Sequence, residues 1–205
     1  DMTADHRLTH TFGMPEVYAK EIAGARLVAN PGCYATGCIL SAYPLRDIIE
    51  RAVFDGISGY SGGGACSKYD YEENVIAYKL TDHFHRKEIA KVLGRQISFT
   101  PHVVNAYAGL MITAHIQLTG KCDAAEVKKA YEKFYNGTFT SVVGHIPNTK
   151  EVTGTPYCRL GGFEMDGDDS IVIVSVIDNL MKGAASQAVE NMNLMFGLNH
   201  KEGLI

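Results

Sequence analysis

Apolar and polar residues alternate most regularly between residues 109 and 118. Every second side chain there is apolar, in the order Leu110, Ile112, Ala114, Ile116 and Leu118. The positions between them hold Met111, Thr113, His115 and Gln117. A period of two residues is typical of a strand with one buried face, so this segment is predicted to be a β-strand.

Three other segments carry strand patterns of different kinds. The run Ile171–Ile177 is apolar on both faces, as a central strand would be, and it ends at an Asp178-Asn179 turn. A short strand is predicted at Leu27–Ala29, and another near Val53–Ile57 that leads into a loop rich in Ser and Gly at residues 58–64. Loops of this kind often carry functional sites.

Helical patterns lie between these strands. Tyr34 to about Ile49 has an apolar helical face that Pro44 should kink or split, and another helix begins around Arg86. Asp123 followed by Glu126 resembles a capping pair at a helix start, with Gly137 as the expected stop. The expected buried stripe of that helix is Val127, Ala130, Tyr131 and Phe134.

A last helix is predicted from Gly183 to Phe196. Its apolar face consists of Ala184, Ala185, Ala188, Val189, Met192, Met195 and Phe196. The face could pack on another domain or on this chain's own sheet. Strands and helices follow one another without regular alternation, which predicts an α+β fold with a mixed, largely antiparallel sheet covered by helices on one face.

Composition narrows the functional classes. The chain has 205 residues, 46% of them hydrophobic, and a formal net charge of −4. This is an ordinary globular composition, and its scattered lysines and arginines form no basic stripe that would bind nucleic acid. No apolar run approaches the roughly 20 residues of a membrane span. Five cysteines without a CxxC pair favour reduced thiols, and no signal peptide is recognisable, so we expect a soluble cytoplasmic protein.

The most informative segment is Asn30-Pro31-Gly32-Cys33-Tyr34-Ala35-Thr36-Gly37. It places Cys33 after a Pro-Gly turn and at the start of a predicted helix. Unpaired backbone N–H groups and the helix dipole stabilise a thiolate there, so Cys33 is the candidate nucleophile with a lowered pKa. The alternative is a cysteine that merely packs as a small hydrophobic residue.

Two histidines stand close together in the segment 81–88. His85 is the first candidate for the acid/base partner of the cysteine, and His83 is either its substitute or a substrate contact. Glu88 follows them and could contact the substrate. A zinc site is the competing interpretation, but no further ligand stands at a recognisable spacing, so no metal is predicted. The two histidines could also simply be solvated.

The loop after the second predicted strand could bind an anion. Ser58, Gly59 and Ser61 combine hydroxyl groups with backbone that can approach oxygen atoms, and we predict them to contact the substrate. A flexible turn is the alternative.

Four segments together resemble one family. They are residues 30–37, 58–64, 99–102 and 177–185, the last reading IDNLMKGAA. In this order they are similar to the N-acetyl-gamma-glutamyl-phosphate reductases, relatives of aspartate-semialdehyde dehydrogenase. The resemblance implies a catalytic domain like the C-terminal domain of glyceraldehyde-3-phosphate dehydrogenase, whose sheet also mediates dimerisation, in a homodimer or homotetramer.

The resemblance also implies an activity. It is the NADP-dependent reduction of N-acetyl-gamma-glutamyl phosphate to N-acetyl-glutamate 5-semialdehyde through a thioester at Cys33, in arginine biosynthesis. Gly37 and Asn179 would then lie beside the nicotinamide. The alternatives are a reductase of a related acyl phosphate, such as aspartyl phosphate or its lysine-pathway counterpart, and a non-catalytic dimerisation module.

The chain departs from the family pattern at its cations. The family's HRHxPE segment has Phe84 and Lys87 here in place of arginine and proline, and the arginine of a PMxRG pattern is absent from residues 105–109. Lys182 is therefore predicted to contact the substrate, with Arg86 or Arg159 as other substitutes. The DHxHxxE form is similar to the reductase part of fungal fused kinase-reductases, which would place a fungal protein in mitochondria.

No GxGxxG stands between a strand and a helix, so the family's NADP-binding Rossmann domain is predicted to be missing from these residues. We expect residues 1–29 to leave that domain, residues 30–180 to form the catalytic and dimerisation domain, and residues 181–205 to pack back on the missing domain. By this interpretation the chain alone is inactive.

Overall fold

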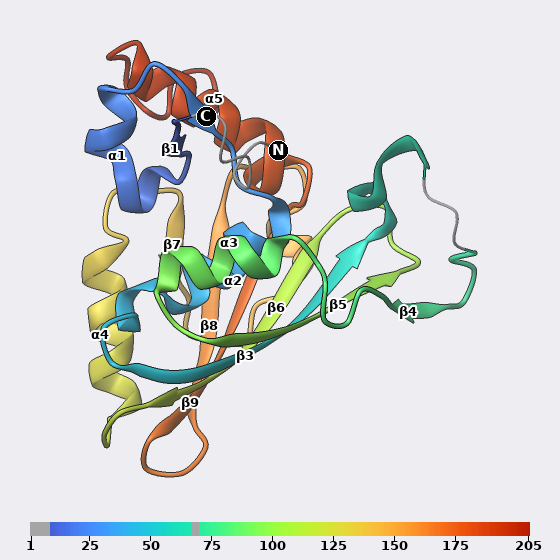
Figure 1. The fold of residues 1–205 in the computed structure, drawn as a ribbon, viewed down its shortest axis with the longest axis vertical. Helices are drawn as coiled ribbons and strands as arrows, with labels where there is room; N and C mark the ends of the chain where they lie inside the picture. Colours follow the sequence, from blue (N-terminus) through green and yellow to red (C-terminus); the bar gives the residue numbers. More distant parts are fainter. Residues whose placement is uncertain (1–8, 67–69) are drawn as a thin grey trace.

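A single mixed sheet organises the computed structural model, which describes residues 9–66 and 70–205. Within these residues seven strands form the sheet in the order β4-β5-β3-β6-β9-β8-β7 (Figure 1). The strands are β3 (Ile49–Gly59), β4 (Val75–Ala77), β5 (Ile97–Val104), β6 (Leu110–Leu118), β7 (Thr140–Val142), β8 (Cys158–Met165) and β9 (Ser170–Ile177). The beginning of the predicted segment 1–29 lies outside the described residues.

Four of the six neighbouring pairs in this sheet are antiparallel: β4 with β5, β3 with β6, β6 with β9, and β9 with β8. The pairs β3–β5 and β7–β8 are parallel. The mixed, largely antiparallel sheet expected from the sequence is therefore confirmed.

Strand β6 buries the side that its alternation predicts. The five apolar positions from Leu110 to Leu118 are at most 1% exposed, whereas His115 and Gln117 are exposed. β9 is buried on both faces over its second half, from Ile173 to Ile177. Both strands thus form because their apolar side chains fill the space under the helices.

Three helices cover one face of the sheet: α2 (Cys33–Ala42), α3 (His85–Leu93) and α4 (Ala124–Phe134) (Figure 1). Every side chain of α2 after Cys33 is buried. Asp123 caps α4 as predicted, since its Oδ1 accepts hydrogen bonds from the backbone N–H of Ala125 at 2.9 Å and of Glu126 at 3.1 Å.

Two helix predictions require correction. The first predicted helix ends at Ala42 instead of Ile49, because Pro44 cannot continue it, and Tyr43–Leu45 form a 3₁₀ turn before β3 begins at Ile49. In α4 the buried stripe is Val127 and Tyr131, continued by Tyr135 after the helix. Ala130 and Phe134, which were predicted to belong to that stripe, are exposed.

A second group of elements forms one end of the molecule. A two-stranded parallel sheet joins β1 (Thr11–Phe12) to β2 (Val28–Ala29), and α1 (Pro15–Ala23) packs against α5 (Ser186–Met195). A π-helical turn, Met181–Ala185, connects β9 to α5. Figure 1 shows α1 and α5 together beyond the covering helices.

Helix α5 buries its polar side. Its buried residues are Ser186, Gln187, Glu190, Asn191 and Asn193. The predicted apolar face points away from the chain instead, with Met192 45% and Phe196 74% exposed. Of the two alternatives for this face, packing on the chain's own sheet is therefore wrong.

Within residues 9–66 and 70–205, none of the helices combines the length and the apolar character that crossing a bilayer requires.

Candidate active site

Cys33 is the first residue of α2, directly after the turn Pro31-Gly32. Gly32 is the extended N-cap residue, and the backbone N–H of Thr36 donates to its carbonyl oxygen at 2.9 Å. The backbone N–H groups of Tyr34 and Cys33 lie close enough to the thiol to lower its pKa. The sequence therefore positions this half-buried thiol where the helix supplies hydrogen-bond donors, as the Pro-Gly turn predicted.

The predicted low pKa of this thiol is wrong for the structure. Burial raises the pKa of Cys33 to about 11, and the negative charge of Glu88 raises it further. The two backbone N–H groups lower the pKa, but by less than burial raises it. Cys33 is therefore a neutral thiol at pH 7 and needs a base to become a nucleophile.

His85 stands beside the cysteine turn. A side chain at position 32 would overlap Nε2 of His85, so the glycine is required for the imidazole to approach the turn. Burial, followed by the nearby His83 and Lys79, lowers the pKa of His85 to about 3. The imidazole is therefore uncharged at neutral pH, and its burial makes it a weak base in the resting protein.

His83 is hydrogen-bonded to the backbone of His85 and lies in an aromatic cluster. Its Nδ1 accepts a hydrogen bond from the backbone N–H of His85 at 3.3 Å. Its ring lies among the rings of Tyr34, Tyr78 and Phe99 at centroid distances of 5.4 to 5.8 Å. Burial and the charge of Lys79 lower the pKa of His83 to about 4, only partly offset by Asp82. Both histidines are 5% exposed, so the solvated alternative is wrong.

A pocket of about 460 Å³ brings part of the predicted set together. Cys33, His85, Ser61 and Asn179 all line it. Asn179 is held rigidly, because its Oδ1 accepts from the backbone N–H of Gly109 at 2.8 Å and its Nδ2 donates to Oγ of Ser61 at 2.9 Å. Residues from four separated segments therefore converge beside the thiol.

Two lining residues were missed as site residues by sequence analysis. A Cβ on Gly183 would lie 2.6 Å from Cβ of Cys33, so only a glycine allows the π-helical turn to close over the cysteine. Asn30 ties the cysteine turn to the same element, since its Nδ2 donates to the carbonyl oxygen of Ala184 at 3.1 Å. Both residues belong to segments recognised in the sequence, but spacing alone gives no sign of this contact.

A family model described as the semialdehyde dehydrogenase dimerisation domain matches residues 33–179. The chain belongs to this family. The chain is 44% identical to the N-acetyl-gamma-glutamyl-phosphate reductase of Methanocaldococcus jannaschii and 42% identical to that of Archaeoglobus fulgidus. Each alignment covers 94% of this chain and 61% of the relative, so the chain spans about three fifths of the length of these reductases.

Solved structures of semialdehyde dehydrogenases share the fold. Aspartate semialdehyde dehydrogenase II from Vibrio cholerae matches with a TM-score of 0.80 at 19% identity, over 96% of this chain and 70% of that one. The enzyme from Francisella tularensis matches with a TM-score of 0.75 at 14% identity, over 93% of this chain and 72% of that one. The predicted resemblance and fold class are confirmed.

Six predicted residues of this family member do not line the pocket: Gly37, Ser58, Gly59, His83, Glu88 and Lys182. Gly37 lies inside α2, where a Cβ would meet Cγ1 of Ile112 at 2.8 Å, so it lets α2 approach β6. Gly59 packs equally closely on the carbonyl oxygens of Ala106 and Tyr107. The hydroxyl of Ser58 is buried and donates to the carbonyl oxygen of Gly59 at 3.0 Å.

Glu88 is also buried, at 3% exposure, and its Oε2 accepts from the backbone N–H of Gly32 at 3.3 Å. It therefore holds the cysteine turn from below and is not placed to contact a substrate.

Lys182 is not placed to contact the substrate. Its side chain is fully buried, with Nζ 2.7 Å from Oε1 of Glu16 and 2.9 Å from Oε2 of Glu190. Of the two other predicted substitutes, Arg86 donates to the carbonyl oxygens of Thr81 and Ile97. Arg159 is bound by the hydroxyl of Ser141. None of these three cations lines the Cys33 pocket.

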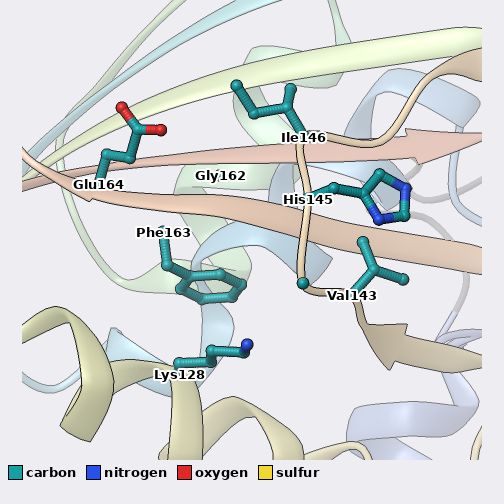
Figure 2. A pocket seen from close by; sticks show the side chains of 8 residues that line it. Lys128, Val143, His145, Ile146, Gly162, Phe163 and Glu164 are labelled. Carbon is teal, nitrogen blue, oxygen red and sulfur yellow. The ribbon is translucent and has the colours of Figure 1, made fainter.

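A separate pocket of about 240 Å³ shares no residue with the Cys33 pocket. Figure 2 shows Lys128 of α4 on one side of it and Phe163 and Glu164 of β8 on another, with His145 and Ile146 on the segment that crosses β8. It forms at the bulge of β8, where Gly162 adopts a φ of +63°. It contains none of the predicted site residues, so the candidate site is the Cys33 pocket.

In the described part of the chain, no group of three or more His, Cys, Asp or Glu side chains is arranged to hold a metal ion.

Proposed function

We propose that the protein containing this chain is an N-acetyl-gamma-glutamyl-phosphate reductase and that Cys33 is its nucleophile. The observation that carries the proposal is the convergence of Cys33 and a neutral His85 on one pocket, in a chain 44% identical to a reductase of that name. Reduction of this acyl phosphate to the semialdehyde is a step of arginine biosynthesis. A cytoplasmic location is part of this proposal.

The chemistry begins with proton transfer. We assign to His85 the removal of the Cys33 proton as the sulfur attacks the carbonyl carbon of the acyl phosphate, because the two side chains line the same pocket. The carbon–oxygen bond to phosphate then breaks, inorganic phosphate leaves, and the acyl group remains on sulfur as a thioester. Once the thioester carbon has been reduced to the aldehyde level, its bond to sulfur breaks, the semialdehyde leaves, and the imidazolium of His85 returns its proton to the sulfur of Cys33.

The negative oxygen that develops during attack needs donors. The backbone N–H groups of the first turn of α2, at Tyr34 and Ala35, lie next to the sulfur by their position in the chain. A donor directed at such an oxygen contributes on the order of 3 kcal/mol to the transition state. The hydroxyl of Ser61, fixed by Asn179, is a second source of hydrogen bonds in the pocket.

A cation for the substrate's anionic groups stands at the edge of the pocket. Nζ of Lys79 lies over the ring of Phe84 at 5.8 Å from its centroid, and Phe84 lines the pocket. We assign Lys79 the role that the family's arginine has at position 84. The exposed lysine then attracts the acyl phosphate or carboxylate.

A nicotinamide cofactor fits the walls of this pocket. Pro31, Leu180 and Ala184 give it a small, apolar side next to Cys33, which suits a flat aromatic ring. When bound, the nicotinamide supplies and accepts hydride. Asn179 and Ala184 border that side of the pocket, and NADP is the form that we propose.

The domain assignment completes the proposal. Residues 30–180 are the catalytic and dimerisation domain, whose uncovered sheet face meets a second copy in a homodimer or homotetramer. The exposed Met192 and Phe196 of the C-terminal segment 181–205 pack against a nucleotide-binding domain that residues 1–29 leave.

The test is phosphate-dependent oxidation of N-acetyl-glutamate 5-semialdehyde with NADP by the complete protein and by this chain alone. If the complete protein turns over this substrate and the chain alone does not, both the substrate and the domain assignment are supported. Turnover of aspartate semialdehyde instead would assign another acyl phosphate as the substrate. A complete protein that is folded but inactive would favour a dimerisation module.

A further inference from the structure

A buried cluster of charges lies beneath the π-helical turn that covers Cys33. Its centre is Lys182, which is 0% exposed and binds Glu16 of α1 at 2.7 Å and Glu190 of α5 at 2.9 Å. Glu16 also accepts from Oγ1 of Thr140 at 3.0 Å, and Glu190 is bound by Nδ1 of His200 at 2.8 Å. The cluster thus joins four parts of the chain that are distant in sequence.

Stability alone does not explain this cluster. Removing an ammonium and two carboxylates from water costs free energy, and well-packed apolar residues of similar volume often stabilise a fold equally well. The two carboxylates, more numerous than the lysine, raise the pKa of Lys182 despite its burial. The ammonium therefore stays charged and strongly held in one place.

Lys182 is held at a position next to Cys33 in the fold. Gly183 follows Lys182 directly, and a Cβ at Gly183 would lie 2.6 Å from Cβ of Cys33 and 3.2 Å from its Cα. The turn has π-helical hydrogen bonds, from the N–H of Gly183 to the carbonyl of Asp178 and from Ala185 to Leu180, both at 2.9 Å. π-helical turns are rare, and their wider backbone needs support from surrounding contacts.

The turn is fixed from both sides. Lys182 holds it from the buried side, whereas Asn30 donates to the carbonyl oxygen of Ala184 from the side of the cysteine turn. If Lys182 lost its partners, the π-helical turn could revert to α-helical hydrogen bonding. Such a change would shift Gly183 relative to the thiol.

We propose that Lys182 is a positioning residue, which sets the location of Cys33 in the pocket by anchoring the π-helical turn between Glu16 and Glu190. It acts through Gly183 and does not touch the substrate. The inference rests on the proposed role of Cys33 as the nucleophile.

The experiment compares variants of the complete protein. Lys182→Met removes the ammonium but leaves two buried carboxylates, and this variant risks misfolding. Lys182→Met combined with Glu190→Met removes two of the three charges, so that only Glu16 loses its cation, and Glu16 keeps its hydrogen bond to Thr140. Lys201→Met is the control, because Nζ of Lys201 lies over the ring of Phe139 at 5.4 Å instead of between the carboxylates.

Three quantities are measured for each folded variant: kcat, KM for the acyl phosphate, and the rate at which iodoacetamide alkylates Cys33 at pH 9. We expect the double variant to lose roughly tenfold or more in kcat with KM within about threefold, since misplacement by about 1 Å can cost 10²-fold. We expect its alkylation rate to change by at least about threefold, and the control to match the wild type.

A folded double variant with unchanged kcat and unchanged alkylation overturns the inference, even if its melting temperature falls, because that result describes a merely structural residue. Should the wild type show no reductase activity, the alkylation rates still decide whether Lys182 positions the thiol. Failure of the proposed function and failure of the positioning role are thereby distinguished.

Discussion

Replacing Gly183 by alanine adds one methyl group at the closest approach to the candidate nucleophile. The new Cβ would lie 2.6 Å from Cβ of Cys33, 3.2 Å from its Cα and 3.3 Å from the carbonyl oxygen of Asp178. Carbon atoms in favourable contact are separated by 3.5 to 4.0 Å. The turn and the cysteine must therefore move apart by about 1 Å to admit this methyl group.

This displacement determines how much stability and activity the substitution costs. Inserting a methyl group into a packed site costs about 1–3 kcal/mol of folding free energy, which in a chain of this size lowers the melting temperature by roughly 2–4 °C for each kcal/mol. A shift of 1 Å at a reacting group can lower the rate by about 10²-fold. We expect Gly183→Ala to reduce kcat by roughly 10- to 100-fold while the protein stays folded.

The assay is steady-state oxidation of N-acetyl-glutamate 5-semialdehyde by the complete protein, together with thermal unfolding. Gly120→Ala is the matched control, because a Cβ at Gly120 meets no atom within 4 Å. The control should retain its activity and melting temperature. A Gly183→Ala protein whose kcat stays within twofold of the wild type would refute the claim that the turn and Cys33 are in close contact.

The remaining predictions concern the ionisable groups. Because the pKa of Cys33 is raised to about 11, its alkylation by iodoacetamide should be slow at pH 7 and rise roughly tenfold per pH unit up to about pH 11; a plateau below pH 9 in the resting protein would contradict the buried thiol. His85→Asn should lower kcat by about 10²- to 10⁴-fold, and His83→Asn by less than about tenfold, since only His85 lines the pocket; equal losses would show that the two roles are not separate. Lys79→Met should raise KM for the acyl phosphate about fivefold without changing kcat, which is the magnitude typical of one exposed charge contact. The control Lys87→Met, at an exposed position on α3, should change neither KM nor kcat. An unchanged KM for Lys79→Met would remove the role assigned to Lys79.

Strong periodicity made some elements predictable from the sequence. β6 and β9 follow their hydrophobic patterns because the sheet buries those side chains directly. β5 and β8 were missed because Pro101 interrupts the apolar pattern of the first, and a bulge at Gly162 and Phe163 interrupts the second. Short-range patterns do not reveal strands that are defined by neighbours distant in sequence.

The candidate site was predictable as a set of segments, but not in the roles of its members. The motifs brought Cys33, His85, Ser61 and Asn179 to one pocket. They did not show that Lys182 and Glu88 are buried beneath it, because charged residues are mostly exposed and the sequence does not give the partners that allow their burial. The raised pKa of Cys33 also depends on burial, which helix position alone does not give.

The most direct test of the account is mass spectrometry of the complete protein after a rapid acid quench, in the presence of N-acetyl-gamma-glutamyl phosphate and without a nicotinamide cofactor. We predict an N-acetylglutamyl adduct on the peptide that contains Cys33, released by hydroxylamine and absent from Cys33→Ser. An adduct on another cysteine, or full turnover by Cys33→Ser, would contradict it.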